Sequence, residues 1–322
     1  MAGGLACALG GCGQNGTDTP GTGAPTTGDP GNTWTALTPM LEARQELAVA
    51  ELFGRIYAAG GYRADGSASN FLEVYDPATS RWTVGAPMPI GVHHPAAAAT
   101  NGRLYVLGGA TASGDSSAVQ EYDPTRNEWQ LRAPMPTARN ASAAAVIDGV
   151  IYVAGGAPTS AGRAFEAYDP RTDRWTVLPS MPTARNHLAA GAVARRFYAA
   201  GGRPPNTLAV VERYDLATGV WSPVRPLPTG RSGIGGVVVR GCFYVIGGEG
   251  STQPGGVFRE NEVYDPRADT WEAVAPMRTP RHGIGAAAVG NVIYVPGGGN
   301  VQGFGTVGVN EAFTVPAAKI CE

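Results

Sequence analysis

A motif of 46 to 50 residues occurs six times along the chain, and this repetition restricts the possible folds more than any other feature. Each copy has a Tyr three residues before a Gly-Gly pair, and in the first five copies a Tyr-Asp element and then a Trp follow; the sixth copy ends at Phe313. The pairs begin at Gly60, Gly108, Gly155, Gly201, Gly247 and Gly297, with steps of 48, 47, 46, 46 and 50 residues. The six tryptophans, Trp34, Trp82, Trp129, Trp175, Trp221 and Trp271, have the same steps. Such a period predicts one structural unit per copy, each packed against its neighbours.

Each repeat contains four short runs with the character of β-strands. In the second copy these are Ala96–Ala99, Leu104–Leu107, Val119–Tyr122 and Trp129–Leu131. The first run is made of small residues in nearly every copy, as expected for strands that crowd around a common axis. The chain also has 47 Gly and 26 Pro, which is typical of many short strands joined by turns. We therefore predict an all-β fold with one four-stranded blade per repeat.

The order Gly-Gly, Tyr-Asp, Trp resembles the Kelch repeat over residues 32–315. This resemblance implies a six-bladed β-propeller of the Kelch type. The sixth repeat lacks its final Trp strand, whereas the chain has an extra one at Trp34-Thr35-Ala36-Leu37. We expect this N-terminal strand to complete the sixth blade, because such closure leaves no exposed sheet edge.

The residues before the repeats differ in composition from the rest of the chain. Residues 1–12 are small and apolar, and Leu9-Gly10-Gly11-Cys12 resembles a bacterial lipobox, which implies lipidation at Cys12. Residues 13–31 are rich in Gly, Thr and Pro and are expected to form a flexible linker, leaving residues 32–322 for the propeller. These two segments predict an extracytoplasmic protein that is attached to a membrane only through the lipid on Cys12. The alternative is that the N-terminal residues have no role.

The formal charge of −2 gives no reason to expect a nucleic acid partner. No run in the sequence approaches the roughly 20 apolar residues of a membrane-spanning helix.

One interval within the repeat varies while the others are nearly constant. From the Gly pair to the Tyr of the Tyr-Asp element there are 15, 14, 13, 13, 17 and 16 residues. Variable loops on a rigid scaffold are where recognition usually lies. The longest are Glu249–Asn261 and Gly299–Asn310, in which Phe258 and Phe304 are candidate contact residues. The alternative is that both rings only pack the loops onto the propeller.

An Arg recurs at the entry to the first strand in five of the six repeats. These residues are Arg44, Arg139, Arg185, Arg231 and Arg281, with Val92 as the exception. Guanidinium groups around one rim would favour a carboxylate or phosphate, so an anionic protein or glycan is a candidate ligand. The alternative is structural: each Arg bonds to backbone carbonyls or to the Glu two residues before the recurring Tyr.

All four histidines follow this Arg position within two residues. They are His93, His94, His187 and His282, and His93, His187 and His282 are our candidates for a ligand site. They lie in alternate repeats, so their side chains could converge above the axis, either as metal ligands or as a polar channel lining. Their offsets from the Arg position are unequal, and we therefore assign no metal and no cofactor.

Two cysteines fall inside the repeats. Cys242 begins the second strand of the fifth repeat and Cys321 follows the third strand of the sixth. Strand direction places both on the face opposite the variable loops, where a disulfide would pin the C-terminal tail and fit an oxidising compartment. The alternative is a buried, reduced Cys242.

The first functional hypothesis is a non-catalytic binding module. The alternative is a carbohydrate-active enzyme resembling the six-bladed sialic acid mutarotases, which place a Glu and an Arg after a Gly pair. Glu249 would then be the general acid/base and Arg259 the carboxylate-binding group, although their spacing here is longer than in that family. A purely structural surface protein is the third hypothesis, and the fold cannot decide among them.

Overall fold

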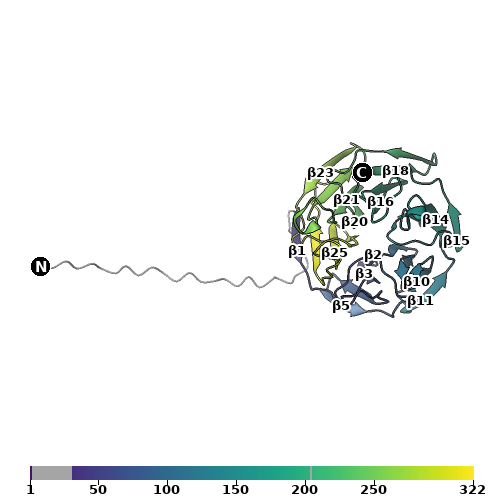
Figure 1. The fold of residues 1–322 in the computed structure, drawn as a ribbon, viewed down its shortest axis with the longest axis horizontal. Helices are drawn as coiled ribbons and strands as arrows, with labels where there is room; N and C mark the ends of the chain where they lie inside the picture. Colours follow the sequence, from purple (N-terminus) through teal and green to yellow (C-terminus); the bar gives the residue numbers. More distant parts are fainter. Residues whose placement is uncertain (2–30, 204) are drawn as a thin grey trace.

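A computed structural model describes Met1, residues 31–203 and residues 205–322. The chain forms six four-stranded antiparallel sheets arranged as a ring around a central axis (Figure 1). This confirms the predicted six-bladed propeller. The predicted leader and linker, with Cys12, lie outside the described residues apart from Met1 and Gly31.

The blades follow one another along the chain, each with its strands in the order inner to outer. Blade 1 contains β2 (Ala48–Leu52), β3 (Arg55–Ala59), β4 (Leu72–Asp76) and β5 (Arg81–Val84). Blade 2 contains β6 (Ala96–Thr100), β7 (Arg103–Leu107), β10 (Val119–Asp123) and β11 (Glu128–Arg132). Blade 3 contains β12 (Ala143–Ile147), β13 (Val150–Ala154), β14 (Phe165–Asp169) and β15 (Arg174–Val177). Blade 4 contains β16 (Ala189–Val193), β17 (Arg196–Ala200), β18 (Val211–Asp215) and β19 (Val220–Pro223).

Blade 5 contains β20 (Gly235–Val239), β21 (Cys242–Ile246), β22 (Asn261–Asp265) and β23 (Thr270–Val274). Blade 6 contains β24 (Ala287–Val289), β25 (Val292–Pro296), β26 (Asn310–Thr314) and β1 (Thr33–Ala36). The loops add a small hairpin, β8 (Ala110–Thr111) with β9 (Gly114–Asp115), and two 3₁₀ turns, Thr159–Ala161 and Pro254–Gly256. Within the described ranges, no helix is long and apolar enough to cross a membrane.

The innermost strands surround a narrow channel and consist mainly of Ala, Gly and Val. The channel wall includes Ala48, Ala96, Ala143, Ala189, Gly235 and Ala286, one residue from each blade. The cavity there is only about 110 Å³. Larger side chains would not fit where six strands converge, so the small first run of each repeat has the expected steric cause.

Aromatic rings fill the wider space between the outer parts of neighbouring blades, as predicted. Cross-blade ring pairs with centroids 5.8 to 6.1 Å apart are Tyr57–Tyr122, Tyr105–Tyr168, Tyr198–Tyr264, Tyr244–Phe313 and Tyr75–Tyr294. Each of the six tryptophans also donates its indole N–H to a backbone carbonyl of the preceding blade, at 2.7 to 2.9 Å. The recurring Trp therefore joins blades by both packing and a directed hydrogen bond.

The N-terminal strand completes the last blade. β1 pairs antiparallel with β26 from Thr33 opposite Thr314 to Ala36 opposite Glu311. In Figure 1 the purple strand β1 lies beside the yellow C-terminal strands for this reason. Trp34 packs on Phe313 at 5.3 Å between ring centroids, which confirms the predicted closure.

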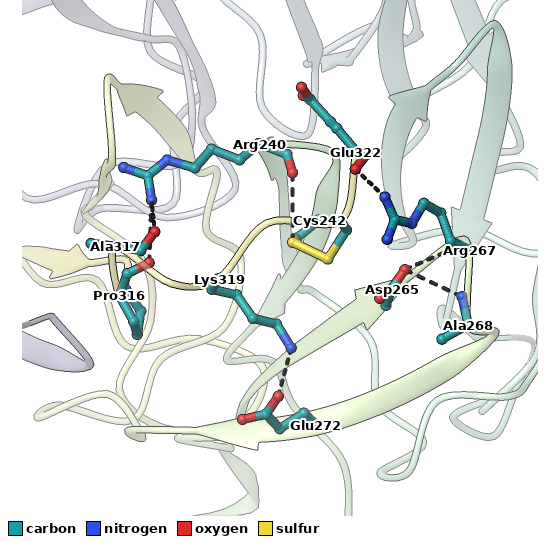
Figure 2. The surroundings of a disulfide bond; sticks show 11 residues. Arg240, Cys242, Asp265, Arg267, Ala268, Glu272, Pro316, Ala317, Lys319 and Glu322 are labelled. Atoms are coloured by element: carbon teal, nitrogen blue, oxygen red, sulfur yellow. Dashed lines mark hydrogen bonds and ion pairs between the residues drawn. A yellow bond between two sulfur atoms is a disulfide. The ribbon is translucent and has the colours of Figure 1, made fainter.

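A disulfide between Cys242 and Cys321 fastens the C-terminal tail to blade 5 (Figure 2). Arg240 donates to the tail carbonyls of Pro316 and Ala317, and Lys319 pairs with Glu272. The cysteine pair is the one expected from strand direction, and it lies on the face opposite the variable loops.

Candidate functional site

The recurring Arg residues point into the blades, and their guanidinium groups are inaccessible. Arg44, Arg139, Arg185, Arg231 and Arg281 are each at most 1% exposed. Each pairs with the Glu of its own blade: Arg44–Glu73 at 2.5 Å, Arg139–Glu166 at 2.7 Å, Arg185–Glu212 at 2.9 Å, Arg231–Glu262 at 2.5 Å and Arg281–Glu311 at 3.1 Å. Burial lowers the pKa of all five guanidinium groups, against the raising effect of their carboxylate partners.

These contacts correct the expectation of an Arg-lined ligand rim. A fully buried cation needs its bonds to carboxylate and carbonyl groups and has no surface left for a ligand. The structural interpretation, which the sequence left open, describes what these residues do.

Blade 2 replaces both members of the pair together. Val92 occupies the Arg position, and Gln120 occupies the Glu position. The Gln120 side-chain amide instead donates to the Ile90 carbonyl and accepts from the Ile90 N–H. The neutral amide thus needs no buried charge as a partner.

A closed ring of backbone hydrogen bonds surrounds the axis on the variable-loop face. Its members lie two residues after the Arg position in the six repeats: Glu46, His94, Ala141, His187, Gly233 and Gly283. Each N–H donates to the carbonyl of the preceding member at 2.7 to 2.9 Å, and Glu46 completes the circle by donating to Gly283. All six have a positive φ between 51° and 64°. We call this set the mouth ring, because it frames the opening of the channel.

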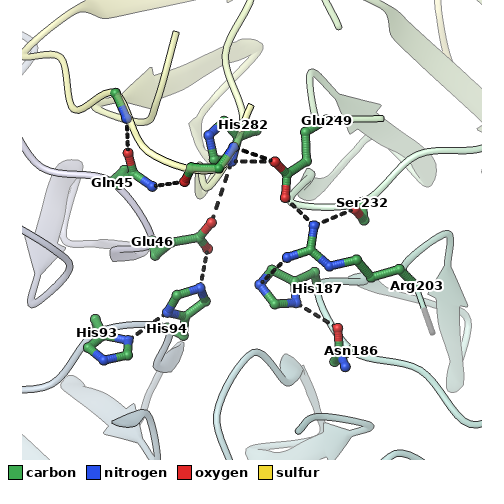
Figure 3. Close-up of polar contacts among 12 residues, drawn as sticks. Gln45, Glu46, His93, His94, Asn186, His187, Arg203, Ser232, Glu249 and His282 are labelled. Atoms are coloured by element: carbon green, nitrogen blue, oxygen red, sulfur yellow. Dashed lines mark hydrogen bonds and ion pairs between the residues drawn. The ribbon is translucent and has the colours of Figure 1, made fainter. Parts of the chain in front are cut away.

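Three members of the mouth ring carry ionisable side chains that meet at the opening (Figure 3). Glu46 lies between His94 and His282, with 3.4 Å from its Oε2 to His94 Nε2 and 3.5 Å from its Oε1 to His282 Nδ1. His94 and His187 meet edge to face with ring centroids 4.9 Å apart. Glycine at position 283 leaves room for the Glu46 carboxylate, because a Cβ there would lie 2.5 Å from Glu46 Oε1, and glycine at position 233 lies beside His282 and Glu249 of an adjacent layer of residues.

That adjacent layer contributes His282, Glu249 and Arg203. His282 Nδ1 lies 3.5 Å from Glu249 Oε2. Arg203 pairs with Glu249 through Nη1 and lies 3.2 Å from His187 Nε2 through Nη2. The six side chains around the opening thus form one connected polar network, shown in Figure 3, which we call the mouth cluster.

The mouth cluster perturbs the pKa values of its members. Burial acts to raise the pKa of Glu46, but His94, His282 and His187 together lower it well below the ordinary value. Burial lowers the pKa of His94, and it lowers the pKa of His187 to about 3. For His282 burial also acts downward, but Glu46 and Glu249 outweigh it and raise the pKa. At neutral pH the cluster therefore contains an ionised Glu46 beside neutral His94 and His187.

Two of the three predicted histidines lie at the axis. His187 and His282 belong to the mouth cluster, but His94 occupies the place expected for His93. The His93 ring instead stacks on Tyr62 at 3.8 Å, away from the channel. Glu46, Arg203 and Tyr62 were not among the residues predicted from the sequence. Glu46 carried a usable signal, because it has the same offset from the Arg position as His94 and His187.

The two candidate aromatic residues of the long loops have different environments. Phe258 is 1% exposed, so its loop is packed onto the propeller and the prediction of a contact residue is wrong there. Phe304 is 47% exposed and contacts Tyr62 edge to face at 5.9 Å. A cavity of about 650 Å³ lies beside Tyr62, with its lining completed by Gly66, Ser67, Ala68, Ile90, Gly91, His93, Thr111, Ala112 and Ser113. We call this hollow the aromatic groove.

Glu249 and Arg259 do not form a common site. Glu249 is 2% exposed, and its oxygens contact Arg203, His282 and the Gly303 N–H. Arg259 donates to the carbonyls of Met277 and Arg278 instead. The pair that the enzymatic alternative requires is therefore not assembled.

Two family descriptions match the sequence. The KLHDC2/KLHL20/DRC7 Kelch-repeats domain matches residues 31–202, and the Kelch motif matches residues 184–228 and 230–278.

Among curated proteins, the F-box/kelch-repeat protein At1g67480 of Arabidopsis thaliana is 42% identical over 52 residues, covering 16% of this chain and 14% of that protein. Kelch-like protein 36 of Mus musculus is 44% identical over 55 residues, covering 17% of this chain and 9% of that protein. The matched segments thus span a small fraction of these relatives.

Among solved structures, that of YjhT superposes with a TM-score of 0.75 and 17% identity, covering 88% of this chain and 98% of that chain. At this identity the likeness concerns the fold alone.

Proposed function

This chain belongs to the Kelch-repeat family, and from that membership we propose that it is a non-catalytic binding module presenting its variable-loop face to a protein or glycan. Membership of the Kelch-repeat family generally indicates a protein-binding module. The finer proposal, that this face is the contact surface, depends on the aromatic groove. The five buried Arg residues give no support to an anionic partner.

The aromatic groove carries the proposal because it combines a hollow with partly exposed rings. Tyr62 and His93 stack on each other in its lining, and Phe304 of a third blade contacts Tyr62 edge to face. Aromatic side chains next to polar loop residues provide large, rigid contact area for a peptide or a sugar ring. Two of the three segments that line the groove belong to the loops that differ in length between repeats, as expected for a recognition surface.

The proposal is tested by probing the purified full chain on a peptide-display library and a glycan array. Tyr62→Ala and Phe304→Ser should each weaken binding of any selected ligand at least about tenfold. The matched control is Phe53→Ser, since Phe53 is 67% exposed in the turn between β2 and β3, on the opposite face. Equal loss in the control, or no loss in the groove variants, would place the contact surface elsewhere.

The mutarotase-like alternative receives no support from the side-chain arrangement. A general acid/base must reach the substrate, and Glu249 is buried and engaged by three partners. Arg259 is committed to backbone carbonyls on another loop. We therefore propose binding rather than turnover.

We also propose an extracytoplasmic location with a lipid anchor at Cys12. The Cys242–Cys321 bridge supports an oxidising compartment, because disulfides are rare in the reducing cytosol. Expressed from its native gene, the protein should partition into detergent, and Cys12→Ser should remove that behaviour. Equal partitioning of the two forms would refute the anchor.

A further inference from the structure

We propose that Glu46, His94 and His187 of the mouth ring form a binding site for a divalent transition-metal ion such as Zn²⁺. Each offers one ligand atom, and the three atoms lie within 4.8 Å of one another. This inference does not depend on the proposed partner at the aromatic groove.

The donor set suits zinc. Two imidazole nitrogens and one carboxylate oxygen are the ligands of many zinc sites that keep an open position. Tetrahedral ligands at about 2.1 Å from the ion lie about 3.4 Å from one another. Glu46 Oε2 and His94 Nε2 already lie 3.4 Å apart, so the remaining adjustment falls mainly on His187.

The backbone holds the three ligands in fixed places. All three belong to the closed ring of hydrogen bonds, in which each N–H donates to the neighbouring member at 2.7 to 2.9 Å. Moving one ligand's backbone would break bonds on both sides of it. The site would thus be largely preformed, which lowers the entropic cost of assembling it around an ion.

Each histidine has a partner on the ring nitrogen that faces away from the opening. His187 Nδ1 lies 2.7 Å from Asn186 Oδ1, to which it donates, leaving Nε2 with a free lone pair. His94 Nδ1 lies 2.7 Å from His93 Nδ1, and donation to that atom likewise frees the Nε2 that faces Glu46. Partners of this kind orient metal-binding histidines and fix their tautomers.

The cavity at the opening and the carboxylates around it also suit a metal ion. A cavity of about 70 Å³ lies against all three ligands, and Gly233 and Gly283 line it without side chains. That volume exceeds the roughly 30 Å³ share of one water molecule, so an ion could keep an exchangeable position. Glu46 and Glu249 provide two carboxylates around the opening, beside the guanidinium of Arg203 and the imidazole of His282.

Arg203 is the group that must move. Its Nη2 lies 3.2 Å from His187 Nε2, the lone pair that the ion would use. Its Nη1 is held by Glu249, and its side chain is 31% exposed. A rotation about the Glu249 contact would therefore release His187 while keeping the guanidinium paired.

Zinc titration calorimetry on the full chain tests the site, with Cys7→Ser and Cys12→Ser introduced to remove competing thiols. We expect one Zn²⁺ per chain with a dissociation constant in the micromolar range or tighter. Glu46→Gln, His94→Gln and His187→Gln should each weaken binding at least about 100-fold, more than loss of an outer partner such as Asn186→Ala, for which about 10- to 100-fold is typical.

The matched control is His93→Asn, which removes a histidine outside the ligand set. The substitution places an Asn directly before His94, as Asn186 stands directly before His187. His94 therefore keeps a hydrogen-bond partner, and zinc binding should stay within about tenfold of the parent. Co²⁺ in place of Zn²⁺ should show the intense visible absorption of a four- or five-coordinate ion in the parent and in His93→Asn.

The ligand variants should lose that absorption, and zinc should raise the melting temperature only of proteins with all three ligands. Because three ligand variants are measured, misfolding of one leaves two decisive results. No zinc binding by the parent, or binding by His94→Gln and His187→Gln as tight as that of the parent, would overturn the proposal.

Discussion

The buried Arg–Glu pairs show how one ion pair maintains a blade in five of the six repeats. Removing one partner would leave the other charged group buried without an opposite charge. Replacing both partners leaves no buried charge that needs compensation. The chain itself contains the second case, because Val92 and Gln120 replace both members in blade 2. Each pair therefore behaves as a unit in its effect on stability.

Giving blade 4 the two residues of blade 2 should therefore restore most of the stability that one substitution alone removes. Arg185→Val should lower the free energy of unfolding by about 3–5 kcal/mol, because Glu212 is left unpaired. Adding Glu212→Gln should recover more than half of that loss. Urea denaturation measures both, with the exposed Arg171→Ala as a control that should change stability by less than about 0.5 kcal/mol. Additive losses in the double variant would contradict the pairing.

At the residue scale the sequence predicted positions better than orientations. The Arg position was evident from its recurrence, but a residue at a strand entry can point into the blade or out to the rim, and recurrence does not distinguish these. The joint exception in blade 2 was the available signal for pairing. Arg203 and Tyr62 were missed because each follows a Gly pair in one repeat only, so no repetition marked them.

At the scale of the strands, the turn between the third and fourth strands links neighbouring blades. Asp173 accepts hydrogen bonds from the Tyr168 hydroxyl at 2.6 Å and from the Ala133 N–H at 2.9 Å, joining blade 3 to the segment after blade 2. Asn127 makes the equivalent contacts with Tyr122 and Ala86. The same link therefore exists in an ionisable and a non-ionisable form.

The ionisable form should make stability depend on pH. Burial acts to raise the pKa of Asp173, but the bonds from Tyr168 and Ala133 and the charge of Arg132 outweigh it, and the net pKa is lowered. The carboxylate thus stabilises the fold above its unfolded pKa, and that contribution is lost as pH falls through the lower folded value. Below about pH 4, the free energy of unfolding should fall less in Asp173→Asn than in the parent. The difference between the two falls should be under about 1 kcal/mol, because the Asp173 side chain is partly exposed.

Denaturation at pH 6 and at pH 3 measures this difference. Glu128→Gln is the control for removing one surface charge, since Glu128 is 67% exposed with Arg126 as its ion-pair partner at 3.6 Å. An Asp173→Asn variant as acid-sensitive as the parent would show that the carboxylate form adds nothing over the amide.

The strands were the most predictable elements, because alternating apolar residues and the fixed turns specify them locally. In blade 2 the four expected runs agree with β6, β7, β10 and β11 to within one residue at each end. The β8–β9 hairpin and the 3₁₀ turns lie in the variable loops, where neither period nor composition repeats. The variable loop of blade 6 likewise contacts another blade, since Phe304 lies against Tyr62 of blade 1.

At the scale of the whole molecule, two connections hold the ends of the chain to the ring. The tail after β26 crosses to blade 5, where the Cys242–Cys321 bridge spans 79 residues of sequence. By the chain-entropy argument a loop of this length stabilises the fold by up to about 4 kcal/mol, although measured gains are often smaller. Cys321→Ser should therefore lower the denaturation midpoint in oxidising buffer.

The control for this prediction is reduction. A reducing agent should lower the stability of the parent to that of Cys321→Ser and leave the variant unchanged, and mass mapping after alkylation should show one bridge in the oxidised parent. Two free thiols in the oxidised parent would contradict the assignment.

The second connection is the strand that closes the ring. β1 supplies the outer strand of blade 6, Trp34 donates to Ala275 of the preceding blade at 2.7 Å, and Asn32 accepts from the Ala275 N–H. Without β1, β26 would become an exposed edge and the aromatic contact with Phe313 would be lost.

Deleting residues 2–40 should therefore lower the melting temperature of the whole ring. Deleting residues 2–30 removes none of the described contacts and should leave it nearly unchanged. A peptide of residues 31–40 added in trans should restore part of the loss by re-forming the strand. Equal melting temperatures for the two deletions would show that the ring is held closed without its N-terminal strand.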